Sequence, residues 1–220
     1  MTTTLSGPMM PPRTGGQARK LMVLLHGYGA DGKDLISLGH YWRDLWPDML
    51  FVSPNAPDPC GSGGPGFEWF PLTADRTVGR LEGAAAARPV LVNFLIDLWA
   101  QTGISPADTV LAGFSQGAMM ALHVGVSLTQ PVAAIVAFSG AFPPPTGFVE
   151  GDFTTPPVAL IHGDLDSVLD PAFSRAAADL LTASGFEVAL HISPGVAHGI
   201  GPDGLDFATA FLKQHLPQNL

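Results

Sequence analysis

The stretch LAGFSQGAMMAL at residues 111–122 places Gly113, Ser115 and Gly117 at the spacing G-x-S-x-G. The segment TVLAGF at 109–114 has the composition of a buried strand, and apolar residues at helical spacing follow the serine. Glycines two positions before and after a serine let a strand and a helix approach closely around a strained turn. The motif alone fits two interpretations equally: a catalytic serine on such a turn, or a tight bend before a buried helix.

Apolar runs with the length of buried strands recur along the chain, and helical patterns alternate with them. The expected strands are 21–25, 49–53, 109–114, 132–138, 157–162 and 187–192, and the expected helices are 33–45, 80–101, 115–128, 171–184 and 204–215. Strands that alternate with helices imply a mostly parallel central sheet with helices on both faces. The sequence therefore predicts an α/β fold.

The length and the termini indicate one domain. A chain of 220 residues is long enough for one sizeable core, so we expect a single domain over 20–220. The segment MTTTLSGPMMPPRTGG is rich in Pro, Gly and Thr, and we expect a flexible N-terminal tail over 1–19. It lacks the apolar core of a signal peptide, and the single cysteine, Cys60, excludes an intrachain disulfide. A cytoplasmic location is the expectation.

Composition disfavours nucleic-acid and membrane partners. The chain has 19 Asp and Glu residues against 10 Lys and Arg, a formal net charge of -9, and no basic run that would meet phosphates. The stretch between Asp108 and Glu150 carries no charge and invites interpretation as a membrane span. Because Gly113, Gly117 and Pro131 break it into pieces, we expect it to form the middle of a core, without stable membrane insertion.

Polar residues follow the predicted strands at the positions where a parallel sheet places its ligand site. In such sheets the ligand lies beyond the carboxyl ends of the strands. The loop from His26 follows the first long strand, Ser115 follows 109–114, Asp166 follows 157–162, and His198 follows the last strand. We therefore expect these side chains to meet at one edge of the sheet.

The side-chain chemistry and the chain order of Ser115, Asp166 and His198 are those of a nucleophilic catalytic triad. A serine hydroxyl needs a histidine to accept its proton and a carboxylate to fix the tautomer of that histidine. The order Ser115, Asp166, His198 is the one found in α/β-hydrolases. His198 lies on a loop between glycines, whereas His162 is expected to shape the acid loop.

The acid is open to choice within HGDLDSVLDP at 162–171. Asp170 suits the cap of the helix that begins near Pro171. Asp164 follows the strand so closely that it is expected to brace the turn. Asp166 is therefore the first choice for the acid, and Asp164 is the second.

A site for acyl transfer also needs donors for the developing oxyanion. The backbone N–H of Gln116, next to the serine, and that of Tyr28, in the loop HGYGADG, are the expected pair. The same loop spells G-x-G-x-x-G, which favours a nicotinamide-dependent oxidoreductase as a rival. Against that rival, the next strand ends in Ser53 and Asn55 where dinucleotide sites carry an acidic residue.

We expect no metal site, because the histidines and the cysteine form no close ligand cluster in the sequence. We expect no cofactor either.

Taken together, the motifs resemble the phospholipase/carboxylesterase family of α/β-hydrolases, which includes bacterial carboxylesterases and acyl-protein thioesterases. The matching pieces are LLHGYGADG at 24–32, SPNAP at 53–57, WF at 69–70, GFSQGAMMAL at 113–122, FSGAF at 138–142, HGDLDSVL at 162–169 and AHG at 197–199. The resemblance implies the α/β-hydrolase fold, the triad Ser115, Asp166 and His198, and backbone oxyanion donors at Tyr28 and Gln116. It also implies cleavage of carboxylic or thioesters, and many members form homodimers. The chain departs from the family at Pro71 and in the glycine-rich segment before Trp69.

The substrate is less constrained by the sequence. Phe67, Trp69, Phe70 and Phe142 are candidates for lining an acyl pocket, and anchoring of long loops explains them equally well. Only Lys33 is a cation close in sequence to the expected site, so a strongly anionic head group is not indicated. We expect a small-molecule substrate with a short or medium acyl ester, with thioesters and lysophospholipids as variants. A protein that keeps the pocket only to bind a ligand is the alternative from another class.

Overall fold

The computed structural model describes residues 5–61, 63–148 and 153–216, and its centre is a seven-stranded sheet of order β1-β3-β2-β6-β7-β8-β9. Its strands are β1 (Met9–Met10), β2 (Lys20–Leu25), β3 (Met49–Val52), β6 (Thr109–Phe114), β7 (Ala134–Phe138), β8 (Val158–Gly163) and β9 (Val188–Ser193). All neighbours pair in parallel except β1, which is antiparallel to β3. A small antiparallel pair, β4 (Asp58–Pro59) and β5 (Phe67–Glu68), lies apart from this sheet.

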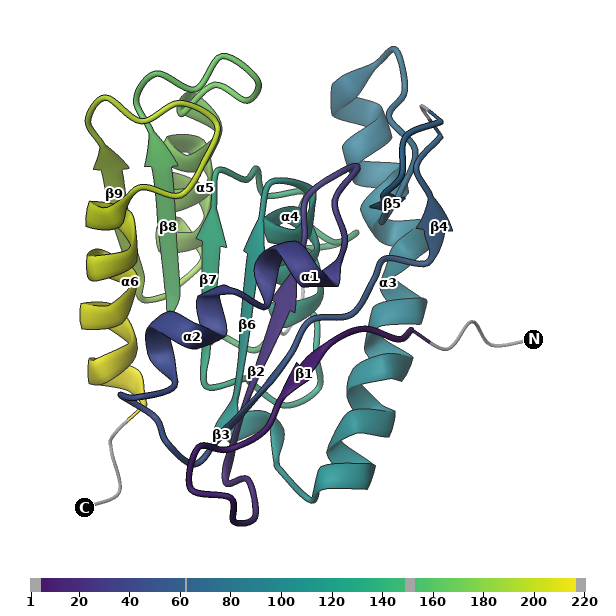
Figure 1. The fold of residues 1–220 in the computed structure, drawn as a ribbon. Coiled ribbons are helices and arrows are strands. Elements are labelled where there is room, and N and C mark those ends of the chain that lie inside the picture. The colour runs from purple at the N-terminus through teal and green to yellow at the C-terminus, as the bar shows by residue number, and fades with distance from the viewer. Residues whose placement is uncertain (1–4, 62, 149–152, 217–220) are drawn as a thin grey trace.

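Helices cover both faces of the sheet, which confirms the predicted α/β class (Figure 1). One face carries α1 (Gly32–Leu35), α2 (Leu38–Trp42) and α6 (Pro202–His215), and the other carries α3 (Arg76–Thr102), α4 (Gln116–Gly125) and α5 (Ala172–Ala183). A short 3₁₀ helix, Pro106–Asp108, precedes β6. Strand residues alternate between the two cores: Val23 packs toward α3 and α4, and Leu24 packs toward α1, α2 and α6.

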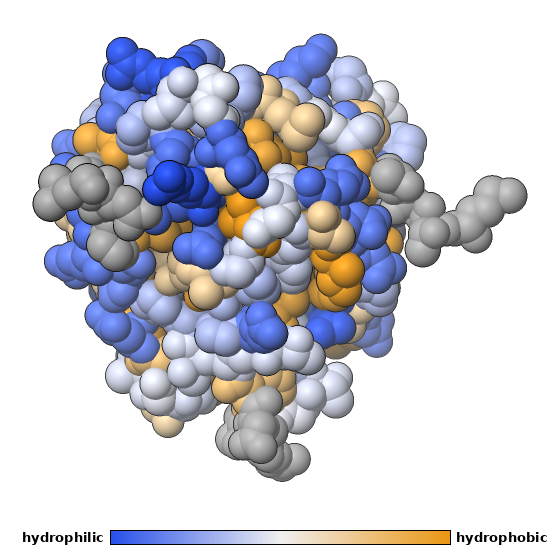
Figure 2. Space-filling model, turned by 90° about the horizontal axis from the view of Figure 1, so that it is seen from below, coloured by the Kyte–Doolittle hydropathy of each residue, from blue (hydrophilic) through white to orange (hydrophobic). Residues whose placement is uncertain are grey.

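The carboxyl ends of the parallel strands all reach one edge, at the top of Figure 1. The loops that carry Ser115, Asp166 and His198 leave the sheet there. Figure 2 views the molecule from the opposite side, where the strands begin, and shows hydrophilic residues interspersed with small apolar areas. The candidate functional residues therefore collect at the edge that parallel-sheet topology predicts.

The expectation of a flexible tail over 1–19 is wrong for the part that the structure describes. Met9 and Met10 pair with β3, Leu5 is buried, and the N–H of Ser53 donates to the carbonyl of Pro8 at 3.0 Å. A free edge of a sheet presents unpaired backbone groups, and an extended proline-containing segment satisfies them without a helix of its own. Residues 1–4 lie outside the described residues.

Two helices differ most from their expected bounds. The helix expected at 33–45 is divided into α1 and α2, and the side chain of Asp31 caps α1 by accepting from the N–H of Lys33 at 2.8 Å. Helix α3 begins at Arg76, four residues before the expected start, because Asp75 caps it by accepting from the N–H groups of Thr77 and Val78. The earlier start brings an extra turn of helix to the edge that carries the loops.

Helix α3 is, among the described residues, the one helix long and apolar enough to cross a membrane by length and composition, a test that core helices also meet. In this fold Leu91 and Leu95 are fully buried in the core that α3 shares with α4.

Candidate active site

Ser115 lies on a sharp turn between β6 and α4, with φ +53° and ψ −113°. A Cβ atom at Gly113 would overlap the carbonyl oxygen of Gly117, and one at Gly117 would overlap the carbonyl oxygen of Leu25. Both glycines are therefore required for β2, β6 and α4 to approach one another. A positive φ at a serine is a costly conformation that surrounding packing must hold, and it is found mainly at functional sites.

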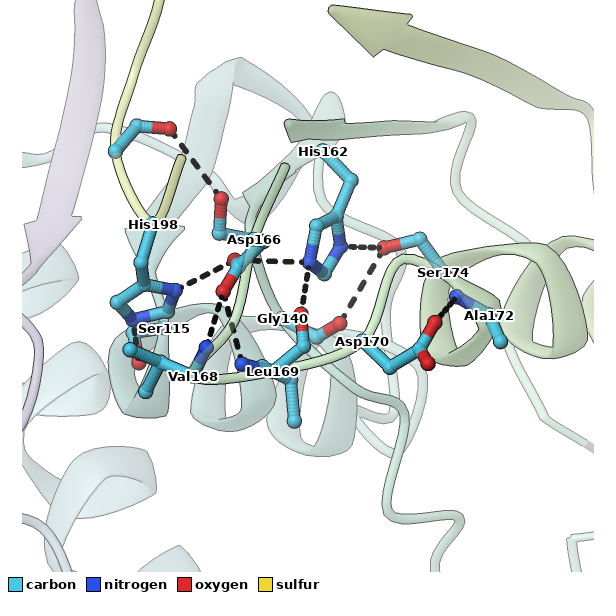
Figure 3. A network of polar contacts seen from close by, with 12 residues as sticks. Ser115, Gly140, His162, Asp166, Val168, Leu169, Asp170, Ala172, Ser174 and His198 are labelled. Carbon is cyan, nitrogen blue, oxygen red and sulfur yellow. Dashed lines mark hydrogen bonds and ion pairs between the residues drawn. The ribbon is translucent and has the colours of Figure 1, made fainter. Parts of the chain in front are cut away.

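Ser115, His198 and Asp166 form a continuous chain of hydrogen bonds (Figure 3). The Nε2 atom of His198 lies 3.0 Å from Ser115 Oγ, and its Nδ1 atom lies 2.6 Å from Asp166 Oδ2. Since a carboxylate only accepts hydrogen bonds, Nδ1 carries the proton and Nε2 is left to accept the serine proton. The structure thus brings together the three residues predicted from the sequence.

The three aspartates in the loop after β8 have different hydrogen-bond partners. Asp166 is buried, and its Oδ1 accepts the N–H groups of Val168 and Leu169, each at 2.9 Å. Burial alone would raise the pKa of Asp166, but the hydrogen bonds from Leu169, His198 and Val168 hold that pKa below its ordinary value of 3.8.

The other two aspartates of the loop contact backbone groups instead. Asp164 accepts the N–H of Gly195 at 2.6 Å, and Asp170 accepts the N–H of Ala172 at 2.8 Å, in the first turn of α5. These contacts match the bracing and capping roles expected for Asp164 and Asp170.

His162 is buried behind the acid and supports its loop. Its Nε2 atom lies 2.8 Å from the carbonyl oxygen of Leu169 and 3.1 Å from Asp166 Oδ2, and its Nδ1 lies 2.7 Å from Ser174 Oγ. Because the Leu169 carbonyl only accepts, Nε2 carries the proton and also donates toward Asp166. His162 therefore positions the carboxylate, as its expected role in shaping the loop requires.

The two expected oxyanion donors flank the serine. Tyr28 and Gln116 both line the cavity that contains Ser115, and Gln116 is the first residue of α4, whose positive end faces that cavity. The side chain of Gln116 points away into the protein, where it accepts the N–H of Trp69 at 2.8 Å and donates to the carbonyl of Phe70 at 2.7 Å. Gln116 thus ties the backbone of Trp69 and Phe70 to the turn that holds the serine.

The cavity around Ser115 has a volume of about 430 Å³ and opens to solvent. A second hollow of about 300 Å³ adjoins it and shares its Asp34, Phe114 and His198. The larger cavity is lined by Gly27, Tyr28, Ala30, Asp34, Phe70, Leu72, Arg76, Arg80, Phe114, Ser115, Gln116, Met119, Val168, Leu169 and His198. A substrate bound at Ser115 thus has open space in the larger cavity and, past His198, in the smaller hollow.

Of the four aromatic residues expected near an acyl pocket, Phe70 alone is among the residues that line this cavity. Trp69 is 2% exposed and its Nε1 donates to the carbonyl of His26 at 3.0 Å. Phe67 begins β5, where its N–H donates to the carbonyl of Ala30 at 2.8 Å. Phe142 packs edge-on against Phe148 at 5.0 Å. Trp69, Phe67 and Phe142 therefore anchor loops, the second of the two roles considered for them.

Several residues of the site carry no signal of that role in the local sequence patterns. Arg76 and Arg80 line the cavity from the first turns of α3, and Met119 lines it from α4. The N-cap at Asp75 was the local signal that would have extended α3 to Arg76. Ser139, with φ +47°, donates to the carbonyl of Gly199 at 3.3 Å and so braces the loop beside His198.

Within the residues that the structure describes, no three His, Cys, Asp or Glu side chains are grouped so as to hold a metal ion. The polar side chains that follow β3 contact backbone groups of the protein itself. Ser53 Oγ donates to the carbonyl of Leu24 at 2.9 Å, and Asn55 accepts the N–H of Gly32 at 2.8 Å. Asn55 thus braces the end of the HGYGADG loop, and Ser53 braces the end of β2.

Comparisons with known proteins agree with this geometry. Residues 13–216 match the model of the phospholipase/carboxylesterase family. The chain is 29% identical to the esterase YpfH of Escherichia coli (strain K12) over 92% of this chain and 85% of that protein. It is 28% identical to acyl-protein thioesterase 1 of Gibberella zeae over 99% of both chains. The crystal structure of esterase PE8 superposes with a TM-score of 0.93 at 55% identity, covering 97% of this chain and 100% of that one. The chain therefore belongs to the phospholipase/carboxylesterase family of α/β-hydrolases and is a carboxylic ester hydrolase.

Proposed function

We propose that the protein hydrolyses short- and medium-chain acyl esters through a Ser115–His198–Asp166 triad and an acyl-enzyme intermediate. The observation that carries this proposal is the hydrogen-bond chain from Ser115 Oγ through His198 to Asp166, at 3.0 and 2.6 Å. A nucleophile, a base and a carboxylate in hydrogen-bond contact are the arrangement that acyl transfer requires.

In the proposed reaction, Ser115 Oγ attacks the carbonyl carbon of the ester while His198 Nε2 accepts the serine proton. The N–H groups of Tyr28 and Gln116 stabilise the oxyanion, and His198 returns the proton to the leaving alcohol. Water then attacks the acyl-enzyme with His198 as base, releasing the carboxylic acid and restoring the serine. Asp166 stays ionised throughout and stabilises the imidazolium.

The size of the cavity and the names of the relatives support the substrate class. About 430 Å³ of open space beside Ser115 holds an acyl chain of modest length. One relative is named an esterase and another an acyl-protein thioesterase, which makes oxygen esters the first substrates to test and thioesters the second.

Kinetics on 4-nitrophenyl esters test the proposal against a protein that only binds a ligand. Because triad members act as a unit, Ser115→Ala and His198→Ala are each expected to lower kcat by about 10⁴- to 10⁶-fold. Wild-type rates in Ser115→Ala would contradict the proposal, and a folded wild-type protein without turnover on any acyl length would favour the ligand-binding alternative.

A further inference from the structure

Two arginines line the same cavity as Ser115, although the sequence placed no arginine near the site. Arg76 is exposed and Arg80 is half-buried, and they lie one turn apart on α3. The Arg80 guanidinium lies over the ring of Phe173 at 4.5 Å, which fixes its direction. The cavity therefore has a cationic wall formed by one helix.

This placement is unfavourable for the protein alone. Two cations four residues apart repel each other, and cations in the first turns of a helix oppose the helix dipole. Burial and the charge of Arg76 both lower the pKa of Arg80, and the nearby Asp75 carboxylate opposes them only in part. Within the part of the chain that the structure describes, neither arginine forms an ion pair with a carboxylate. The oxygen Oδ1 of Asp75, the nearby N-cap, is occupied by the backbone N–H groups of Thr77 and Val78.

In the proposed reaction, the arginines would lie on the acyl side of the scissile bond. His198 must protonate the leaving alcohol, so the leaving group lies beside His198 and Phe114, where the smaller hollow opens. That hollow includes Asp34 but neither arginine. The arginines instead line the larger cavity together with Phe70 and Leu72, which belong to the loop before α3. Asp34 lines both hollows, so a negative group in the smaller hollow would meet Asp34 without the guanidiniums, whereas one in the larger cavity could reach them.

We propose that the enzyme favours acyl groups that carry a distal anionic group, of which a terminal carboxylate is the simplest, and that Arg76 and Arg80 bind this group. The proposal rests on the proposed ester hydrolysis and names its substrate class. A guanidinium presents paired donors that match a carboxylate, and a bound anion removes the repulsion between the two cations. The apolar residues Phe70, Leu72 and Met119 would contact the methylene chain between the carboxylate and the ester.

The test compares matched substrates that differ only in the acyl terminus. The 4-nitrophenyl esters of hexanoic and octanoic acids are set against the mono-4-nitrophenyl esters of adipic and suberic acids. The measured quantity is the ratio of kcat/KM for the anionic ester to that for the neutral ester of equal length. We expect Arg76→Gln and Arg80→Gln each to lower this ratio about tenfold at one chain length or both. Raising NaCl from about 0.05 to 0.5 M should lower the wild-type ratio and leave that of the double variant nearly constant.

Two controls separate recognition from other effects. Lys213→Gln removes an exposed cation near the end of α6, and its ratio should stay within about twofold of wild type. The hexanoyl ester of 4-hydroxybenzoate carries the anion on the leaving group, and the arginine variants should change its rate, relative to phenyl hexanoate, less than they change the adipate rate. A larger effect on the hydroxybenzoate ester would overturn the assignment of the arginines to the acyl side.

The outcomes distinguish this inference from the proposed function. If the wild type hydrolyses the neutral esters and the arginine variants leave the ratio unchanged at both lengths, the inference is wrong and ester hydrolysis stands. If the folded wild type hydrolyses neither the neutral nor the anionic esters, both proposals are wrong.

Discussion

His198 Nδ1 and Asp166 Oδ2 share a hydrogen bond of 2.6 Å, made by a carboxylate whose side chain is completely shielded from solvent. The second oxygen of the carboxylate is held by the N–H groups of Val168 and Leu169. The imidazole ring is thereby fixed in direction and tautomer from behind, and it also packs against the ring of Phe114 at 4.9 Å.

Replacing each aspartate in turn is expected to show that Asp166, and not Asp164, is the catalytic acid. Asp166→Asn keeps the shape of the side chain but favours the wrong histidine tautomer, so kcat should fall about 10⁴-fold. Asp164→Asn, which alters only the contact with the N–H of Gly195, should lower kcat less than tenfold. Steady-state kinetics on one ester decide the matter, and a greater loss of kcat in Asp164→Asn would assign the acid to Asp164.

His162 is expected to act on catalysis through Asp166. Substitution of His162 by Ala removes one buried hydrogen-bond partner from Ser174 and one from Asp166, so the free energy of unfolding should fall by about 1–3 kcal/mol. Because the carboxylate loses one of its supports, kcat should fall about tenfold while KM changes little. Urea unfolding and ester kinetics of the same preparation measure both. A loss of stability with an unchanged kcat would show that His162 only packs.

The serine turn is expected to depend on Gly117. An alanine at this position would place Cβ against the carbonyl of Leu25, which is held in β2 and cannot move away. Gly117→Ala should therefore lower the free energy of unfolding by about 3 kcal/mol or prevent folding. Gly16→Ala, in an exposed loop with open space for a Cβ, should change it by less than about 1 kcal/mol. A Gly117→Ala protein as stable as Gly16→Ala would show that this turn is not tightly packed.

The lowered pKa of Asp166 predicts the sign of an acid effect on stability. A carboxylate whose folded pKa lies below its ordinary value stabilises the fold above that ordinary value, and the contribution is lost as pH falls through the folded pKa. Wild-type unfolding free energy should thus fall more steeply than that of Asp166→Asn below about pH 4. Asp203, whose pKa is lowered chiefly by its hydrogen bond to His191, is much more exposed, so Asp203→Asn should change the slope less. Equal slopes for wild type and Asp166→Asn in urea unfolding between about pH 5 and pH 3 would contradict the prediction.

Periodicity and chain order were sufficient to predict the sheet and the three residues that meet at its edge. Strand runs such as VALIH are buried on both faces, so they are continuous and easily found, and the loops after them necessarily converge. The choice of Asp166 over Asp164 also agrees with the contacts, because the residue nearer the strand braces the turn.

Other features depend on contacts between distant segments, which local patterns do not encode. The pairing of Met9 and Met10 with β3 depends on a free sheet edge, and a Pro- and Gly-rich composition conceals it. Trp69 lines no part of the cavity because the side chain of Gln116, 47 residues later, holds its backbone. Arg76 and Arg80 lie far in sequence from the triad, and Arg76 belongs to α3 only because the helix begins one turn earlier than its apolar pattern suggests.

Labelling with a fluorophosphonate tests the central claim most directly, because this reagent bonds covalently to a serine only where a base and oxyanion donors activate it. The wild-type protein is incubated with the probe, digested, and the modified peptide is identified by mass spectrometry, with Ser115→Ala as the matched control. The structure predicts stoichiometric labelling at Ser115, a rate lowered at least about 10³-fold in His198→Ala, and no labelling of Ser115→Ala. A folded wild-type protein that remains unlabelled, or a label on another serine, would contradict the account.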